Sequence, residues 1–162
     1  MHEHQVRKRL TALSIALLGL LFASAAWSQK QSERNSASEH NQPPFRLATA
    51  KWSEPYSGPL GYPKGAQRAS LGVDPRFGGE TYYARFPAGS RFALHWHAHA
   101  EYAVVLRGKV THILGKERHS LEVGDYVVIP PKVPHGWEVD ASADVFLLIR
   151  RDGPADFNFV ER

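Results

Sequence analysis

The chain has 162 residues, a formal net charge of +4 and no cysteine. Without cysteine, neither a disulfide framework nor a lipid-modified cysteine anchor can form, so the folded part must be stabilised by its own apolar core. A charge this small, with no basic cluster beyond the first residues, argues against nucleic acid as a partner.

The first 28 residues have the order of a secretory signal peptide. Arg7, Lys8 and Arg9 precede an apolar run at 10–27, and small residues follow the core of that run. We predict that residues 1–28 are removed on export and that the mature protein is periplasmic or secreted, with no stable membrane association. The alternative is a retained anchor, because the run is nearly as long as the roughly 20 residues of a spanning helix.

Two segments separate this leader from the patterned part of the chain. Residues 29–50 begin as a polar stretch that ends in a proline pair, which predicts a disordered linker. Residues 51–78 are rich in glycine and proline but carry large aromatic side chains such as Trp52. Because isolated aromatic rings gain nothing in water, we expect an N-terminal arm packed on the core and able to cover a sheet edge.

Residues 79–150 contain short runs of β-branched and aromatic residues separated by turn signals. The runs are 81–86, 90–97, 101–106, 109–114, 125–130, 135–139 and 144–150. Strands at this spacing, without helical periodicity between them, predict an all-β fold made of one antiparallel sandwich or barrel. Residues 151–162 are then a C-terminal tail.

Three histidines and a glutamate occupy every second position from His95 to Glu101. Side chains two apart on a strand share a face, so His95 and His97 form a pair. A straight strand would put Glu101 about 20 Å beyond His95, too far for one ion whose ligands lie at about 2.0–2.2 Å. If both bind one metal, the chain must bend at 98–100. His99 then points elsewhere, either as an exposed side chain or as a proton carrier near the entrance.

A further candidate ligand, His135, lies 34 residues after Glu101. Prolines at 130, 131 and 134 stiffen the approach to it, and Gly136 would permit a close turn after it. A rigid loop of this kind can hold His135 opposite the strand pair and complete a site of three histidines and one glutamate. We expect the pocket walls to come from Phe92 or Trp96, Ala103, Val105 and Trp137.

The spacing of these residues resembles the first cupin motif at every position, and the second in part. The first motif is matched by Gly89, five residues, His95-Trp-His97, three residues, Glu101, six residues and Gly108. The second is matched by Gly124, Pro130 and His135, but Lys132 stands where the motif has glycine and Val139 where it has asparagine. The flanks at 65–75 and 152–158 are similar to those of single-domain cupins related to the ChrR-type cupin domain. This similarity does not imply the regulatory role of ChrR for this chain.

In cupins the residues at these positions bind one Mn, Fe, Ni, Cu, Co or Zn ion inside a small double-sheet barrel. The resemblance therefore implies a jelly-roll-like fold and one divalent metal ion held by His95, His97, Glu101 and His135, with Glu101 also taking part in catalysis. Small cupins often dimerise through sheet edges or exchanged arms, so a homodimer is expected as well.

Three imidazoles and one carboxylate leave open positions on a five- or six-coordinate ion, which can polarise a substrate oxygen or bind dioxygen. We therefore expect a metal-dependent enzyme, a dioxygenase-like oxidoreductase or another metal-assisted transformation, acting on a small oxygen-rich or aromatic molecule. The alternative is a binding or sensing module in which the ion anchors a ligand without turnover. A metal-free cupin is the third and weakest interpretation.

Overall fold

Ten β-strands follow one short 3₁₀ turn, η1 (Leu47–Thr49), in the computed structural model, which describes residues 43–58 and 61–160. The strands are β1 (Gln67–Val73), β2 (Glu80–Phe86), β3 (Arg91–Trp96), β4 (Glu101–Arg107), β5 (Val110–Leu114), β6 (Glu117–Leu121), β7 (Tyr126–Ile129), β8 (His135–Val139), β9 (Val145–Arg151) and β10 (Asn158–Phe159). The predicted signal peptide and residues 29–42 of the predicted linker lie outside the described residues. None of the described helical residues forms a helix that is long and apolar enough to cross a membrane.

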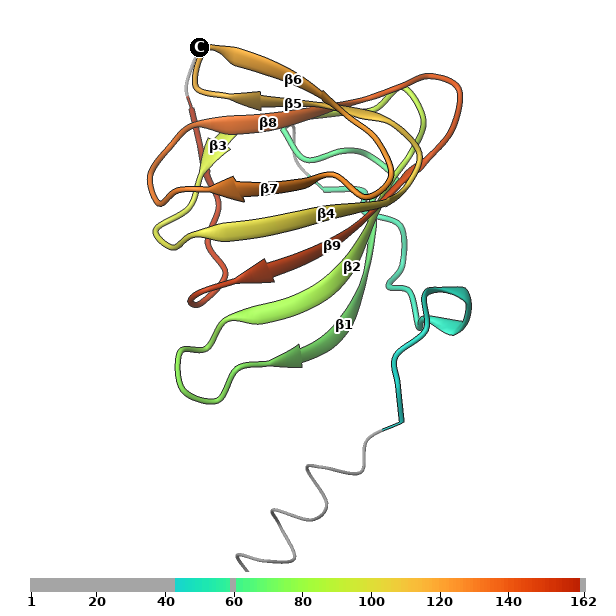
Figure 1. The fold of residues 1–162 in the computed structure, drawn as a ribbon, viewed down its shortest axis with the longest axis vertical. Coiled ribbons are helices and arrows are strands. Elements are labelled where there is room, and N and C mark those ends of the chain that lie inside the picture. Colours follow the sequence, from blue (N-terminus) through green and yellow to red (C-terminus); the bar gives the residue numbers. More distant parts are fainter. Residues whose placement is uncertain (1–42, 59–60, 161–162) are drawn as a thin grey trace, which may run out of the picture. The chain divides into compact units, whose positions relative to one another are not determined.

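The strands form two antiparallel sheets that face each other (Figure 1). One sheet has the order β1-β2-β9-β4-β7 and the other β10-β3-β8-β5-β6. Among the described strands no pairing joins the two sheets, so they pack as a double-sheet jelly roll rather than as a barrel closed by hydrogen bonds. The predicted all-β, cupin-like double-sheet fold is confirmed.

The core is built by the side chains that alternate inward along each strand, as expected for sheets buried on one face. On β9 the buried positions are Val145, Leu147, Ile149 and Arg151. On β4 they are Glu101, Ala103 and Val105. Glu101 and Arg151 lie opposite each other in the β4–β9 register, so the same alternation that fills the core brings two charged side chains to one end of it.

Each of the seven predicted runs contains a strand, whereas β1, β6 and β10 were not anticipated. Four of the five residues of β6 are exposed, so that strand carries no apolar alternation. β1 lies within residues 51–78, the predicted arm, and β10 has only two residues. Without hydrophobic periodicity, short or exposed strands give no signal in the sequence.

The segment before β1 lies along the edge of that strand. Ser53 and Tyr56 donate backbone hydrogen bonds to the carbonyl oxygens of Arg68 and Ala66, both at 2.8 Å. Trp52 packs edge-on against Phe146, with ring centroids 5.7 Å apart. These bonds occupy polar groups that an edge strand would otherwise present to solvent.

At the other end of the chain, β10 adds to the edge of β3. Asn158 pairs with Trp96, and Phe159 pairs with His95. Residues 152–157 therefore cross from β9 in one sheet to β3 in the other, over the end of the fold at which Glu101 and Arg151 meet.

Candidate metal centre

Three buried histidines converge at this end of the fold. His95 comes from β3, His97 follows that strand directly, and His135 is the first residue of β8. One ring nitrogen from each lies within 4.8 Å of the others, and the side chains are between 0 and 3% exposed. His95 and His135 are register partners beyond a bulge in β3, an irregularity that often re-aims side chains beside a functional site.

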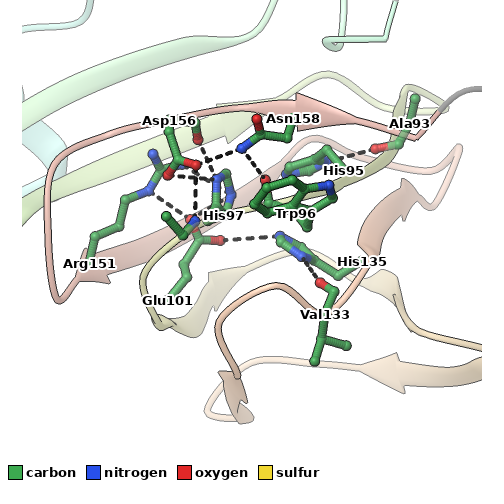
Figure 2. Close-up of polar contacts among 11 residues, drawn as sticks. Ala93, His95, Trp96, His97, Glu101, Val133, His135, Arg151, Asp156 and Asn158 are labelled. Carbon is green, nitrogen blue, oxygen red and sulfur yellow. Dashed lines mark hydrogen bonds and ion pairs between the residues drawn. The ribbon is translucent and has the colours of Figure 1, made fainter.

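Each of these histidines is fixed by a hydrogen bond from its Nδ1 atom to a backbone carbonyl (Figure 2). His95 donates to Ala93 at 2.7 Å, and His135 donates to Val133 at 3.1 Å. His97 donates to the carbonyl oxygen of Asp156, on the segment between β9 and β10. With the proton on Nδ1, the lone pair of each Nε2 atom is free to bind a metal, which is how ligating histidines are usually oriented.

Burial keeps the three rings neutral. Burial, with a smaller contribution from the charge of His135, lowers the pKa of His95 to about 2. It is also the main cause that lowers the pKa values of His97 and His135, although Glu101 opposes it in both cases. The Nε2 atom of His135 is buried without a hydrogen-bond partner among the described residues. Neutral, converging imidazoles with an unsatisfied nitrogen fit a divalent transition metal.

Glu101, the predicted fourth ligand, lies beside the three histidines but does not belong to the group whose ligand atoms converge. Its Oε2 atom is 3.5 Å from Nε2 of His97, and its Oε1 atom is 4.0 Å from Nε2 of His135. The carboxylate instead accepts a hydrogen bond of 2.9 Å from Nε of Arg151. The structure thus places Glu101 within a short displacement of the site and pairs it with a cation.

His99, the other histidine of the motif, is exposed and lies outside the converging group. The chain bends between residues 97 and 100 and passes from β3 in one sheet to β4 in the other. On the outside of this bend the His99 ring covers Gly153 so closely that a Cβ atom at that position would overlap it.

The loop before His135 differs from what its motif predicts at two positions. Lys132, which stands where the cupin motif has glycine, has a positive φ of 62°, and its N–H donates to the carbonyl of His97 at 2.8 Å. Gly136 does not form the close turn that it would permit after His135, because β8 continues through this residue to Val139. A Cβ atom on Gly136 would lie 2.8 Å from the carbonyl oxygen of Phe92, so glycine is needed for the close approach of β3.

Comparison with known families identifies the domain. Residues 82–149 match the model of the Cupin domain, which spans both motifs and all three converging histidines. Residues 82–149 are thus a cupin domain. A search of curated proteins gave no match.

Solved structures agree with this cupin fold. A cupin-2 domain from Rhodospirillum rubrum is 20% identical with a TM-score of 0.61, covering 75% of this chain and 82% of its own. A cupin 2 conserved barrel domain protein from Rhodopseudomonas palustris is 23% identical with a TM-score of 0.59, over 70% and 79% of the two chains. The polyketide cyclase RemF from Streptomyces resistomycificus is 16% identical with a TM-score of 0.58, over 75% and 87%. At these identities the likeness establishes the fold alone.

Arg151 is the residue of the cupin site that motif reasoning missed. It is 3% exposed, its Nη2 atom donates to Nε2 of His97 at 3.4 Å, and its guanidinium lies 4.6 Å from the centre of the Phe157 ring. The predicted C-terminal tail begins at residue 151, whereas β9 includes Arg151 as its last residue. The signal was the inward alternation of β9, which continues from Ile149 to Arg151.

A cavity of about 310 Å³ lies next to the candidate metal centre. Its wall includes Tyr56, Tyr62, Arg68, Phe157 and Phe159. The rings of Phe157 and Phe159 lie 5.0 Å from His97 and 5.8 Å from His95, respectively, so they stand between the cavity and the histidines. The residues predicted to line the pocket are not in the wall of this cavity. Phe92, Ala103, Val105 and Trp137 belong to the buried core, and Trp96 is partly exposed.

His112, on β5, is a fourth buried histidine. Its ring packs 4.3 Å from Trp137 and 6.1 Å from His135, and its Nε2 atom has no partner among the described residues. Burial, followed by the charges of His135 and His119, lowers its pKa to about 4. His112 thus packs near the ring of His135 but does not belong to the group of converging histidines.

Proposed function

We propose that this protein is an exported metal-dependent cupin enzyme that holds one divalent transition metal through His95, His97 and His135 and transforms a small oxygen-rich or aromatic molecule. The observation that carries the proposal is the convergence of three neutral imidazoles, each with its Nδ1 proton committed to a carbonyl. A purely structural cluster would have no reason to leave a buried Nε2 atom without a partner.

Such a site suits catalysis because three protein ligands leave coordination positions open. A bound divalent ion supplies Lewis-acid polarisation of a substrate oxygen and, if it is redox-active, a place for dioxygen. Among the described residues, Glu101 is the one buried carboxylate beside the histidines, and its Oε1 atom lies 4.0 Å from Nε2 of His135. In this proposal Glu101 either completes the ligand set or accepts a proton from the substrate.

The cavity supports a small substrate with an apolar part. Its volume of about 310 Å³ is at the lower end of the range for small-molecule sites. Aromatic side chains on its wall would cover a planar or apolar face of the molecule. Its oxygen atoms would reach the metal centre once the rings of Phe157 and Phe159, which lie between the two, move aside. RemF, a polyketide cyclase, has the same fold. The fold is therefore compatible with a reaction that involves no net oxidation.

The test is to purify the protein, measure bound metal by mass spectrometry, and follow product formation and oxygen uptake over a panel of phenols, catechols and organic acids. We expect one equivalent of metal and turnover of at least one compound. Oxygen uptake would identify an oxidoreductase, and turnover without it a Lewis-acid reaction. Binding without conversion of any compound would favour the sensing module and contradict the enzyme proposal.

Matched variants connect the result to the site. His97→Ala should abolish stoichiometric metal, because it removes one of three converging ligands. His99→Ala, two residues away on the exposed bend, should retain the metal. Export rests on residues 1–28 alone and is tested separately, by locating the processed protein in periplasmic and cytoplasmic fractions.

A further inference from the structure

A guanidinium group is buried beside the three histidines and adds a positive charge to the candidate metal site. Arg151 is 3% exposed, and its Nε atom donates to Glu101 at 2.9 Å. Its Nη2 atom donates to Nε2 of His97 at 3.4 Å. Arg151 therefore uses the same lone pair of His97 that a metal ion would use (Figure 2).

One lone pair cannot accept a hydrogen bond and bind a metal at the same time. When an ion binds to Nε2 of His97, the Nη2 donor of Arg151 loses its acceptor. A buried charged donor without a partner is costly, so the loaded site favours a new acceptor at this position. Glu101 alone cannot balance the charges, because a divalent ion and one guanidinium face a single buried carboxylate.

The charged groups around the site leave this excess uncompensated. Arg68, whose guanidinium lies 5.0 Å from the Tyr82 ring centre, is already paired with Glu80. Asp156 contributes a carboxylate oxygen 3.8 Å from Nδ1 of His97, on the side of the ring that faces away from Nε2. The vicinity of Nε2 thus keeps a net positive charge after metal binding, and it attracts an anion.

We propose that Arg151 binds an anionic group of the substrate, a carboxylate or a comparable oxyanion, and that it becomes available for this only after the metal has bound. This proposal rests on the proposed function, since it requires a metal at the three histidines, and it names the substrate class of that site. A planar guanidinium suits a carboxylate because two parallel N–H donors can meet its two oxygens. The neighbouring Phe157 ring, 4.6 Å from the guanidinium, limits access of water to the pair.

The experiment uses Co²⁺ as the metal and oxalate as the anionic probe, with calorimetry and the visible spectrum of Co²⁺ as readouts. Oxalate should bind to the Co²⁺-loaded protein and perturb the spectrum, and it should not bind to the metal-free protein. In Arg151→Met the affinity for oxalate should fall about 10- to 100-fold, the loss expected for a charge-assisted hydrogen bond. Arg151→Lys, which keeps the charge but not the two parallel donors, should show an intermediate loss.

Two controls separate this effect from damage to the site. Arg150→Met removes the preceding arginine, which lies on the exposed face over Tyr102, and should bind oxalate like the wild type. Imidazole, a neutral ligand for the open metal position, should bind equally to wild type and Arg151→Met. Both variants should retain one equivalent of Co²⁺ and the wild-type circular dichroism spectrum.

Equal oxalate affinity in wild type and Arg151→Met, or equal affinity with and without metal, would overturn the inference while leaving the metal site intact. Failure of the wild type to bind any divalent metal would instead overturn the proposed function and this inference with it. If Arg151→Met does not fold, the comparison of Arg151→Lys with wild type decides, and an unchanged oxalate affinity there contradicts the proposal.

Discussion

The carboxylate of Glu101 and the guanidinium of Arg151 face each other across β4 and β9, with 2.9 Å between Oε2 and Nε and both side chains 3% exposed. A buried ion pair contributes little net stability, because desolvation of both charges offsets their attraction, but removal of one partner leaves the other uncompensated. In this protein the pair lies at the end of the core beside the three histidines, so removal of either partner should lower the stability of the fold.

Glu101→Ala should destabilise the metal-free protein by about 3–5 kcal/mol, since Arg151 then remains as a buried unpaired charge. The double variant Glu101→Leu/Arg151→Leu should recover most of this loss. The measurement is urea unfolding followed by tryptophan fluorescence. A double variant that is no more stable than the single one would contradict this account of the pair.

Lys132→Gly should leave the protein as stable as the wild type or stabilise it by up to about 1 kcal/mol. The φ of 62° at Lys132 is strained for a side chain with a Cβ atom, and relief of this strain competes with the greater entropy of glycine in the unfolded chain. Lys116→Gly is the matched control, because Lys116 is an exposed turn residue without a positive φ and should only lose stability. A clear loss of stability in Lys132→Gly would show that the side chain itself is needed.

Phe157→Ala should accelerate exchange of the metal. The Phe157 ring packs on His97 and Arg151 and forms part of the cavity wall. Its removal should therefore open a path between the cavity and the candidate metal centre. The rate at which a chelator removes Co²⁺ should rise several-fold in stopped-flow absorbance. Phe77→Ala, which truncates a ring that is 62% exposed, should release the metal at the wild-type rate. Equal rates in all three proteins would mean that metal exchange follows another route.

The pH dependence of stability should include a contribution from His112. Its folded-state pKa of about 4 lies below the value of 6.5 expected in the unfolded chain, so the unfolded state binds the proton first as the pH falls. The associated stability is fully present above about pH 6.5 and is lost as the pH falls to about 4, by at most about 3 kcal/mol. Replacement by leucine removes this proton uptake. Between pH 7 and pH 5, the unfolding free energy of the wild type should therefore fall relative to that of His112→Leu, measured at pH 7, 6 and 5. A difference between the two proteins that stays constant with pH would refute this contribution.

The histidines and the fold could be predicted because their information is local. His95, His97 and His135 lie in motifs of fixed spacing, and seven strands carry apolar alternation strong enough to detect. Arg151 and Asp156 could not be placed in this way, because their roles depend on which strand lies beside which. Only the β4–β9 register brings Arg151 to Glu101, and only the pairing of β10 with β3 brings the carbonyl of Asp156 to His97. Sequence spacing carries no direct record of such partners.

The hydrogen bond between His97 and the carbonyl of Asp156 has a consequence for the order of folding. A polypeptide made from its N-terminus presents His95 and His97 long before residue 156 is synthesised, and His135 arrives between them. Until the last strand has added to β3, the His97 ring has no fixed tautomer or orientation at this site. In the proposed metal centre, tight coordination would therefore be one of the final events in the maturation of the chain, and nascent fragments that end before β10 would present these histidines without their final geometry.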